Sequence, residues 1–152
     1  MKYHFKIHKE KDGFWAKCIE LSGCITQADS MKELHENMQE ALNLYVEEPE
    51  NSKKLAALPD ESISPSRSIV EVQLDPSIAF SFMVRYNRIK NGLTQQQAAN
   101  KLGFENVYSY QRLENKKCNP TFRTLSQIKN TFPEFSVDFL FESQRRIDCR
   151  GC

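Results

Sequence analysis

The sequence predicts an α+β domain followed by an all-α domain, in a chain of 152 residues. Apolar and polar residues alternate near the N-terminus, which is typical of strands with one buried face. From Ser77 onwards the apolar residues recur at helical spacing instead. The charge divides at the same place: residues 1–76 hold 9 Lys and Arg against 14 Asp and Glu, a net −5, whereas residues 77–152 hold 12 against 6, a net +6. The total of +1 hides this asymmetry, which suggests two modules with partners of opposite charge.

The composition indicates a globular protein, with 39% hydrophobic and 27% charged residues. The N-terminal segment lacks the apolar centre of a signal peptide, and no stretch approaches the roughly 18–20 apolar residues of a membrane span. Five cysteines, an odd and scattered set, favour free thiols in a reducing compartment. Cys149 and Cys152 form a CxxC pair without a second ligand pair, so we expect a mobile tail there rather than a metal site.

Residues 3–28 are expected to form three strands. Apolar residues alternate with polar ones at the start, and later residues are rich in aromatic and β-branched types. Gly and Asp supply the turns, because Gly tolerates positive φ and Asp bonds its own backbone. The elements expected are a strand with Tyr3, Phe5 and Ile7, a turn at 11–13, a strand from Phe14 to Leu21, a break at 22–23 and a strand from Cys24 to Ala28.

A helix, a loop and a fourth strand complete the first module. Ser30 and Glu33 match a capping box, in which each side chain satisfies a backbone amide at the start of a helix. The apolar stripe that follows consists of Met31, Leu34, Met38, Ala41, Leu42 and Tyr45. Residues 49–67 read as a Pro- and Ser-containing loop, and Ser68 to Leu74 as a strand. The order β-β-β-α-β implies an antiparallel-rich sheet with a helix on one face.

The rest of the chain is expected to form five short helices joined by tight turns, a compact all-α module. The first carries an apolar stripe of Ile78, Phe82, Met83, Tyr86 and Ile89 and stops at Asn91-Gly92. The others are expected at 95–102 with Thr94 as N-cap, at 106–115, from 119–121 through Thr131, and at 136–141.

The segment from Leu93 to Gly103 has the pattern of a helix-turn-helix. The two helices cross steeply, so the residue nearest the crossing must be small, and Ala99 occupies that position. Four residues later the chain must turn with positive φ, which Gly103 permits. Tyr110 and Leu113 of the next helix can fill the apolar space between the two helices. Further residues of the pattern are Glu114-Asn115, Asn119-Pro120, Thr124-Leu125 and Ile128.

The segment 93–141 therefore resembles the Cro/C1-type (XRE-like) DNA-binding family, which implies binding to double-stranded operator DNA. The turn at 104–106 is one residue longer than usual in that family. A recognition helix presents polar residues near its N-terminus to base edges, and basic residues around it neutralise phosphates. The expected DNA-binding residues are Gln95, Asn106, Tyr108, Ser109, Gln111, Arg112, Lys116, Lys117 and Arg123. Tyr108 has two interpretations, since it can stack on the sugar-phosphate backbone or close the core.

The first module carries a second set of matching segments. In chain order they are Tyr3-x-Phe5-x-Ile7, Asp12-Gly13-Phe14-Trp15-Ala16, Glu20-Leu21-Ser22-Gly23-Cys24, Thr26-Gln27, Asp29-Ser30, and Glu40-Ala41-Leu42 with Tyr45. As a set they resemble the HicB antitoxin family over residues 1–48 and the strand at 69–74. The resemblance implies a partial RNase H-like fold and neutralisation of a HicA-type toxin, a small basic ribonuclease. A C-terminal DNA-binding module is a usual companion in that family and represses the operon that encodes both proteins.

An acidic module suits a basic partner, because complementary charge raises the association rate and selects the partner. The expected toxin contacts are Phe14, Trp15, Glu20 and Asp29, with the acidic face of the helix. Trp15 has an alternative interpretation as a core residue, the commoner place for a large aromatic side chain.

The module is not expected to be an enzyme. An RNase H-like active site needs several carboxylates around two metal ions, whereas Asp12 lies in a turn and Asp29 at a helix cap. His4 and His8 project from one strand face about 13 Å apart, too far to share a metal ion. We therefore expect no catalytic residue, no metal and no cofactor.

Together these patterns predict a HicB-like toxin-neutralising domain over residues 1–75, a helix-turn-helix DNA-binding domain over 76–143 and a tail over 144–152. The hypothesis is a type II antitoxin that neutralises a HicA-type mRNA interferase and represses its own operon. Palindromic operators match two-fold proteins, so a homodimer or higher homo-oligomer is expected, in the bacterial cytoplasm and at the nucleoid when bound to DNA. Two alternatives stay open: a one-component transcriptional regulator with a ligand- or protein-sensing N-terminal domain, and a nuclease delivered to DNA by its helix-turn-helix.

Overall fold

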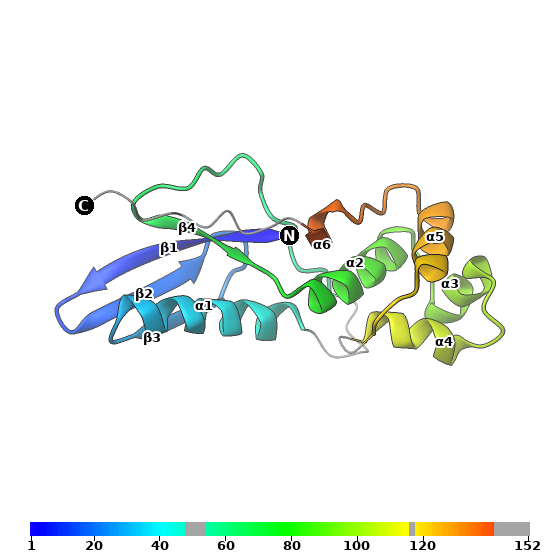
Figure 1. The fold of residues 1–152 in the computed structure, drawn as a ribbon, viewed down its shortest axis with the longest axis horizontal. Coiled ribbons are helices and arrows are strands. Elements are labelled where there is room, and N and C mark those ends of the chain that lie inside the picture. The colour runs from blue at the N-terminus through cyan, green and yellow to red at the C-terminus, as the bar shows by residue number, and fades with distance from the viewer. Residues whose placement is uncertain (48–53, 116–117, 142–152) are drawn as a thin grey trace.

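The computed structural model describes residues 1–47, 54–115 and 118–141. In chain order its elements are β1 (Lys2–Glu10), β2 (Gly13–Cys18), β3 (Ile25–Ala28), α1 (Met31–Val46), β4 (Ile69–Gln73), α2 (Pro76–Lys90), α3 (Gln95–Leu102), α4 (Val107–Gln111), the 3-10 helix η1 (Arg112–Glu114), α5 (Phe122–Thr131) and α6 (Asp138–Phe141). Figure 1 shows an elongated molecule in which the sheet and α1 form one end, α3, α4 and α5 form the other, and α2 lies between them. The prediction of a mixed α+β chain with an antiparallel sheet and five following helices is confirmed.

The four strands form one antiparallel sheet in the order β3-β2-β1-β4. Alternation places one face of the sheet on a hydrophobic core: Tyr3 and Phe5 of β1 are fully buried, whereas Lys6 between Phe5 and Ile7 is exposed. Helix α1 packs on that face through Leu34, Met38, Leu42 and Val46. Ser30 caps the start of α1 as predicted, since its Oγ accepts a hydrogen bond from the Glu33 amide at 3.2 Å, but the Glu33 carboxylate accepts from the amide of Asp29 at 3.3 Å rather than from that of Ser30.

Several predicted element boundaries are wrong: the third and fourth strands are each shorter than predicted, running from Ile25 to Ala28 and from Ile69 to Gln73, and three larger or better explained differences follow. Strand β2 ends at Cys18 rather than Leu21, because the chain turns there to bring the Glu20 carboxylate onto the amide of His4 at 3.1 Å. The helix expected at 106–115 begins at Val107 and tightens into the 3-10 helix η1 over its last turn. The last helix begins at Asp138 rather than Ser136, whose hydroxyl accepts from the Asp138 amide at 3.2 Å.

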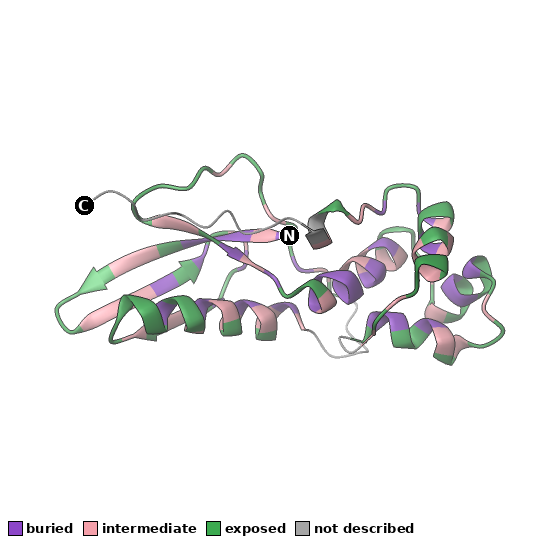
Figure 2. Ribbon diagram, viewed as in Figure 1, coloured by how far each residue is buried: buried purple, intermediate pink, exposed green. Residues whose placement is uncertain are grey.

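Helix α2 contributes to two hydrophobic cores at once. Ile78, Ala79 and Phe82 pack into the core of the sheet and α1, whereas Phe80 and Val84 pack into the core of the C-terminal helices. Figure 2 shows buried residues along much of α2. The predicted apolar stripe is therefore one of two buried faces of this helix. The domain boundary predicted after residue 75 stays a prediction, and it falls where this shared helix begins.

Candidate nucleic-acid interface and partner surface

Capping side chains fix both ends of the turn from α3 to α4. At the start of α3, the Gln97 amide donates to Thr94 Oγ1 at 3.2 Å and the Thr94 amide donates to Gln97 Oε1 at 2.9 Å. At its end, Gly103 has a φ of 76°, the left-handed conformation that the sequence pattern requires. Asn106 then accepts a hydrogen bond from the Ser109 amide at 3.0 Å and caps α4. These caps set where α4 begins relative to α3.

The packing of α3 against α4 also follows the predicted pattern. Ala98 and Ala99 have no exposed surface, and they share a core with Tyr110 and Leu113, which are 0% and 5% exposed. Small residues at this crossing allow the two helices to approach closely. The burial of Ala99, Tyr110 and Leu113 and the positive φ of Gly103 therefore agree with the predicted pattern.

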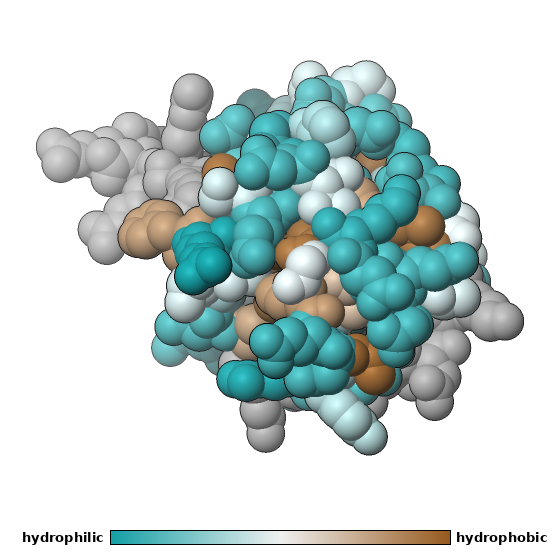
Figure 3. Space-filling model, turned by 90° about the vertical axis from the view of Figure 1, so that its right-hand side faces the viewer, coloured by the Kyte–Doolittle hydropathy of each residue, from teal (hydrophilic) through white to brown (hydrophobic). Residues whose placement is uncertain are grey.

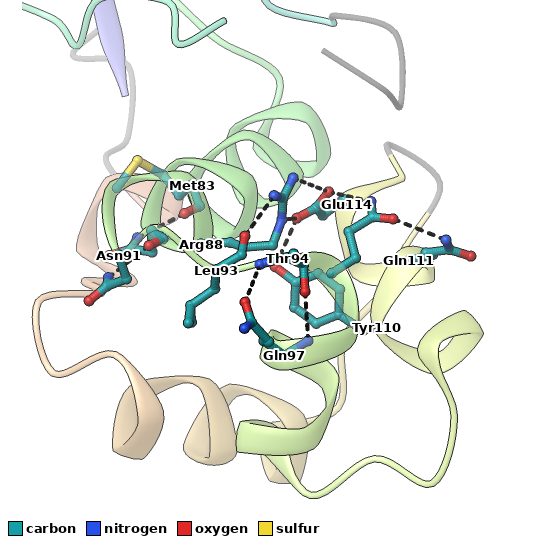
Figure 4. Close-up of polar contacts among 11 residues, drawn as sticks. Met83, Arg88, Asn91, Leu93, Thr94, Gln97, Tyr110, Gln111 and Glu114 are labelled. Carbon is teal, nitrogen blue, oxygen red and sulfur yellow. Dashed lines mark hydrogen bonds and ion pairs between the residues drawn. The ribbon is translucent and has the colours of Figure 1, made fainter. Parts of the chain in front are cut away.

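A buried carboxylate, Glu114, ties three helices together (Figure 4). The Arg88 guanidinium on α2 donates to it twice, Nε to Oε1 at 2.6 Å and Nη2 to Oε2 at 3.1 Å. Tyr110 on α4 donates its hydroxyl to Oε1 at 2.8 Å, and Gln95 on α3 donates to Oε2 at 2.9 Å. Gln111 in turn donates to Gln95 Oε1 at 3.0 Å. Since the Glu114 side chain is only 3% exposed, these hydrogen bonds hold α4 from its buried side.

The surroundings of Arg88 and Tyr110 shift the pKa values of both groups, so that Arg88 stays charged and Tyr110 stays neutral. Burial opposes the charge of Arg88, but the hydrogen bonds and charge of Glu114 outweigh it and raise the pKa of Arg88. Burial also raises the pKa of Tyr110, and the Glu114 charge acts in the same direction, so Tyr110 remains a neutral donor. Glu114 therefore holds one permanent cation and two neutral donors.

Several of the predicted DNA-binding residues are exposed on α4 or on the neighbouring elements η1 and α5. Figure 3 views this end of the molecule and shows a mostly hydrophilic surface with small apolar areas. Tyr108 is 74% exposed, which excludes its interpretation as a core residue. Gln111 and Arg112 are exposed beside it, and Arg123 is exposed on α5.

The remaining predicted DNA-binding residues either form hydrogen bonds within the protein or lie outside the described residues. The amide oxygen of Asn106 caps α4 and also accepts from the Ser109 hydroxyl at 3.1 Å. The half-buried Gln95 is held by Glu114 and Gln111. Lys116 and Lys117 lie outside the described residues.

At the other end of the molecule, three of the four predicted toxin contacts surround one hollow. Phe14, Trp15 and Asp29 line a volume of about 760 Å³ at the tip of the β1–β2 hairpin. The carboxylates that line it are Glu10, Asp12, Asp29 and Glu33. Because Glu36 and Glu40 are exposed on α1, negative charge continues from the hollow along the helix.

Glu20, the fourth predicted toxin contact, is not available at this surface. Its side chain is 4% exposed and its Oε1 lies 2.7 Å from His4 Nδ1. The carboxylate also accepts from the backbone amides of His4 at 3.1 Å and Asp60 at 3.3 Å. Although burial acts against ionisation, the hydrogen bonds from His4 hold the pKa of Glu20 below its ordinary value. Glu20 thus fastens the segment that precedes β4 to strand β1.

The pairing of Arg88 with Glu114 is not predicted from the sequence. Glu114 belongs to the Leu113-Glu114-Asn115 motif, which is the signal that could have identified it. Its cation lies 26 residues earlier in the chain, on a helix that is predicted from its apolar residues alone. Trp15 is also placed differently from its core interpretation, because its ring stacks on His8 with centroids 4.0 Å apart.

Within the part of the chain that the structure describes, no group of three or more His, Cys, Asp or Glu side chains is arranged to hold a metal ion. None of the described helices is long and apolar enough to cross a membrane. Cys149 and Cys152 lie outside the described residues.

No family model matches the chain. A UPF0150 protein of Archaeoglobus fulgidus is 44% identical to it over 52 residues, which are 34% of this chain and 75% of that protein. The matched stretch is about a third of the chain, so this similarity concerns one part of the protein rather than its whole length.

Proposed function

The chain belongs to the UPF0150 family, which includes HicB-like proteins, and on this basis we propose that it is the antitoxin of a toxin–antitoxin pair. Family membership supports a toxin partner in general. The finer proposal is that this partner is a HicA-type mRNA interferase and that the first module has a partial RNase H-like fold. Neutralisation then requires that the toxin's RNA-binding surface be covered, and this chain performs no catalytic step.

The acidic surface at the hairpin tip and along α1 is the proposed docking site for the basic toxin. Its hollow is lined by the carboxylates of Asp29 and Glu33, by Phe14, whose ring packs on the α1 side of the sheet, and by Trp15, whose ring lies on the opposite face against His8. Aromatic residues supply large contact area in protein interfaces, and complementary charge speeds association. Glu20 is left out of this docking site because its carboxylate is buried.

The helical half is the proposed DNA-binding domain, of Cro/C1 type, with which the protein represses its own operon. One observation carries this proposal: the Glu114 cluster holds α4 rigidly while the outward residues of that helix stay polar or aromatic and exposed. A recognition helix needs both properties, since base contacts require side chains held in a fixed frame. Gln111 suits adenine and Arg112 suits guanine, whereas Arg123 suits phosphate.

Repression by a helix-turn-helix protein requires two reading helices on one operator, so the active form is proposed to be a homodimer or a higher homo-oligomer. Half-sites one helical turn apart, about 34 Å, would match such a dimer.

Co-expression tests the antitoxin proposal. We expect the full chain to restore growth to cells that express the small basic protein encoded next to its gene. A failure to rescue, with both proteins present in the cells, would refute the antitoxin role. Binding of the purified chain to the DNA upstream of its gene, against a scrambled duplex of the same length, tests the repressor role separately.

A further inference from the structure

The face of the sheet opposite α1 carries a pair of lysines, unlike the acidic surface proposed for the toxin, although Trp15 and Ile25 border both surfaces. We call this surface the open face and define it by Lys6 and His8 of β1, Trp15 and Lys17 of β2, and Ile25 of β3. Their neighbours along the strands point the other way: Phe5 and Ala16 have no exposed surface, and Cys18 is 5% exposed. The open face is therefore the side of the sheet that α1 does not cover.

Two lysines lie directly opposite each other in the middle of this face. Lys6 pairs with Lys17 across β1 and β2, and both are exposed. Directly opposed like charges destabilise a sheet, and among the described residues neither lysine has an ion-pair partner. In a module whose net charge is −5, Lys6 and Lys17 therefore form a local positive patch, with the carboxylate of Glu10 at the hairpin end of the same strand face.

An aromatic pair stands next to the lysines. His8 pairs with Trp15 in the same ladder, and their rings are stacked with centroids 4.0 Å apart and an interplanar angle of 9°. Ile25, opposite Lys17 on β3, is 58% exposed. Neighbouring positions on three strands therefore hold an aromatic stack, an apolar side chain and two lysines that form no ion pair among the described residues.

We propose that the open face binds single-stranded nucleic acid, with a base stacked on the Trp15–His8 pair and phosphates on Lys6 and Lys17. Open antiparallel sheets bind single strands in this way, because every base has a flat face to stack and every linkage carries a negative charge. A duplex keeps its bases stacked on one another and cannot use the aromatic pair. A basic toxin would be repelled by the lysines, and so would a second copy of the same face.

The single Trp of the chain makes a direct test possible. We expect the fluorescence of Trp15 in the full-length protein to be quenched saturably by an oligouridine of about 12 nucleotides. Oligothymidine of equal length is the second arm: quenching by either supports the proposal, and the stronger quencher identifies RNA or DNA as the source. A duplex operator should leave the fluorescence unchanged.

Variants then separate stacking from charge. With a labelled oligouridine, Trp15→Ala should weaken binding about tenfold and Trp15→Phe should restore most of it. In Lys6→Gln/Lys17→Gln the slope of log affinity against log salt should approach zero from about −1.4, the value for two phosphate contacts. Lys90→Gln, on an exposed lysine of the other half, is the matched control and should change neither quantity.

The proposal is overturned if oligonucleotides do not quench Trp15 at low salt, or if the double lysine variant binds them as the natural protein does. Equal quenching by polyglutamate would also overturn it, because the open face would then recognise acidic protein segments. None of these outcomes depends on the toxin or the operator, so they leave the proposed antitoxin role to its own test.

Discussion

The two halves of the molecule each bury one carboxylate, but they use it differently. Glu20 is bonded by the ring of His4 and by the backbone amides of His4 and Asp60, so it fastens a loop to a strand. Glu114 is bonded by side chains from α2, α3 and α4, so it fixes helices relative to one another. The difference is that Glu20 joins a loop to a strand, whereas Glu114 also sets the orientation of a helix with exposed side chains.

Helix α2 joins these two halves through its opposite faces. Phe82 is 2% exposed in the core of the sheet, and Phe80 is 2% exposed in the core of the C-terminal helices. If α2 belongs to both cores, Phe80→Ala and Phe82→Ala should each lower the free energy of unfolding by about 3–5 kcal/mol. Each should also reduce amide protection in both halves, as measured by hydrogen exchange. Loss of protection confined to one half would mean that the halves unfold independently.

Removal of Glu114 should cost almost as much. Glu114→Ala leaves the partly buried Arg88 without its anion, so we expect a loss of about 3 kcal/mol in urea unfolding together with loss of operator binding. Lys90→Ala is the matched control, because the Lys90–Glu134 pair at 2.8 Å is more than half exposed on both sides. That variant should leave the free energy of unfolding nearly unchanged, because solvent screens an exposed ion pair. Equal effects of the two variants would contradict the role assigned to Glu114.

Substitution of the exposed residues at the end of α4 and the start of η1 should weaken DNA recognition and leave the free energy of unfolding nearly unchanged. Gln111→Ala and Arg112→Ala should each reduce discrimination between operator and mismatched duplex by about 1–3 kcal/mol. Lys116→Ala, if that residue contacts phosphate, should weaken binding to all duplexes alike. Competition binding with labelled duplexes measures both quantities. A common effect of all three variants would show that the recognition helix has been assigned to the wrong residues.

The smallest effect is expected at Glu20. Glu20→Gln should cost about 1–2 kcal/mol at neutral pH, because the amide replaces a charge-assisted hydrogen bond. The pKa of Glu20 is depressed in the folded protein, so its stabilisation is present above the ordinary glutamate value of about 4.3 and is lost as the pH falls through the folded value. Urea unfolding at a series of acid pH values should therefore show a shallower decline for the variant than for the natural chain. Parallel declines would show that Glu20 is not the titrating group.

The sequence predicts local structure well where neighbours in the chain decide it. The capping pairs Ser30–Glu33 and Thr94–Gln97, the left-handed Gly103 and the buried Ala99 all depend on residues a few positions apart. Long-range partners are different, because Glu114 reaches an arginine 26 residues away and Glu20 a histidine 16 residues away. The second buried face of α2 is not predicted for the same reason, because the residues that pack on Phe80 come from the C-terminal helices, which lie later in the chain.

The candidate site residues show the same contrast between features set by neighbours in the chain and features set by distant partners. Exposure on a short helix can be predicted from helical spacing, because the polar positions face away from the apolar stripe. This applies to Tyr108, Gln111, Arg112 and Arg123, which are exposed. Glu20 is buried, because the loop before β4 covers it and the sequence does not reveal where that loop lies. The stack of Trp15 on His8 depends on strand register, which the alternation of residues alone leaves open.

The most direct test separates the two proposed activities in one protein. Cells that carry the neighbouring basic protein and a reporter driven by the upstream DNA are supplied with the full chain or with Gln111→Ala/Arg112→Ala. We predict that the double variant still restores growth but no longer represses the reporter, because these residues lie at the end of α4 and the start of η1, far from the acidic hollow at the hairpin tip (Figure 1). Loss of rescue by a folded double variant, or retention of repression, would contradict the division of function between the two ends of the molecule.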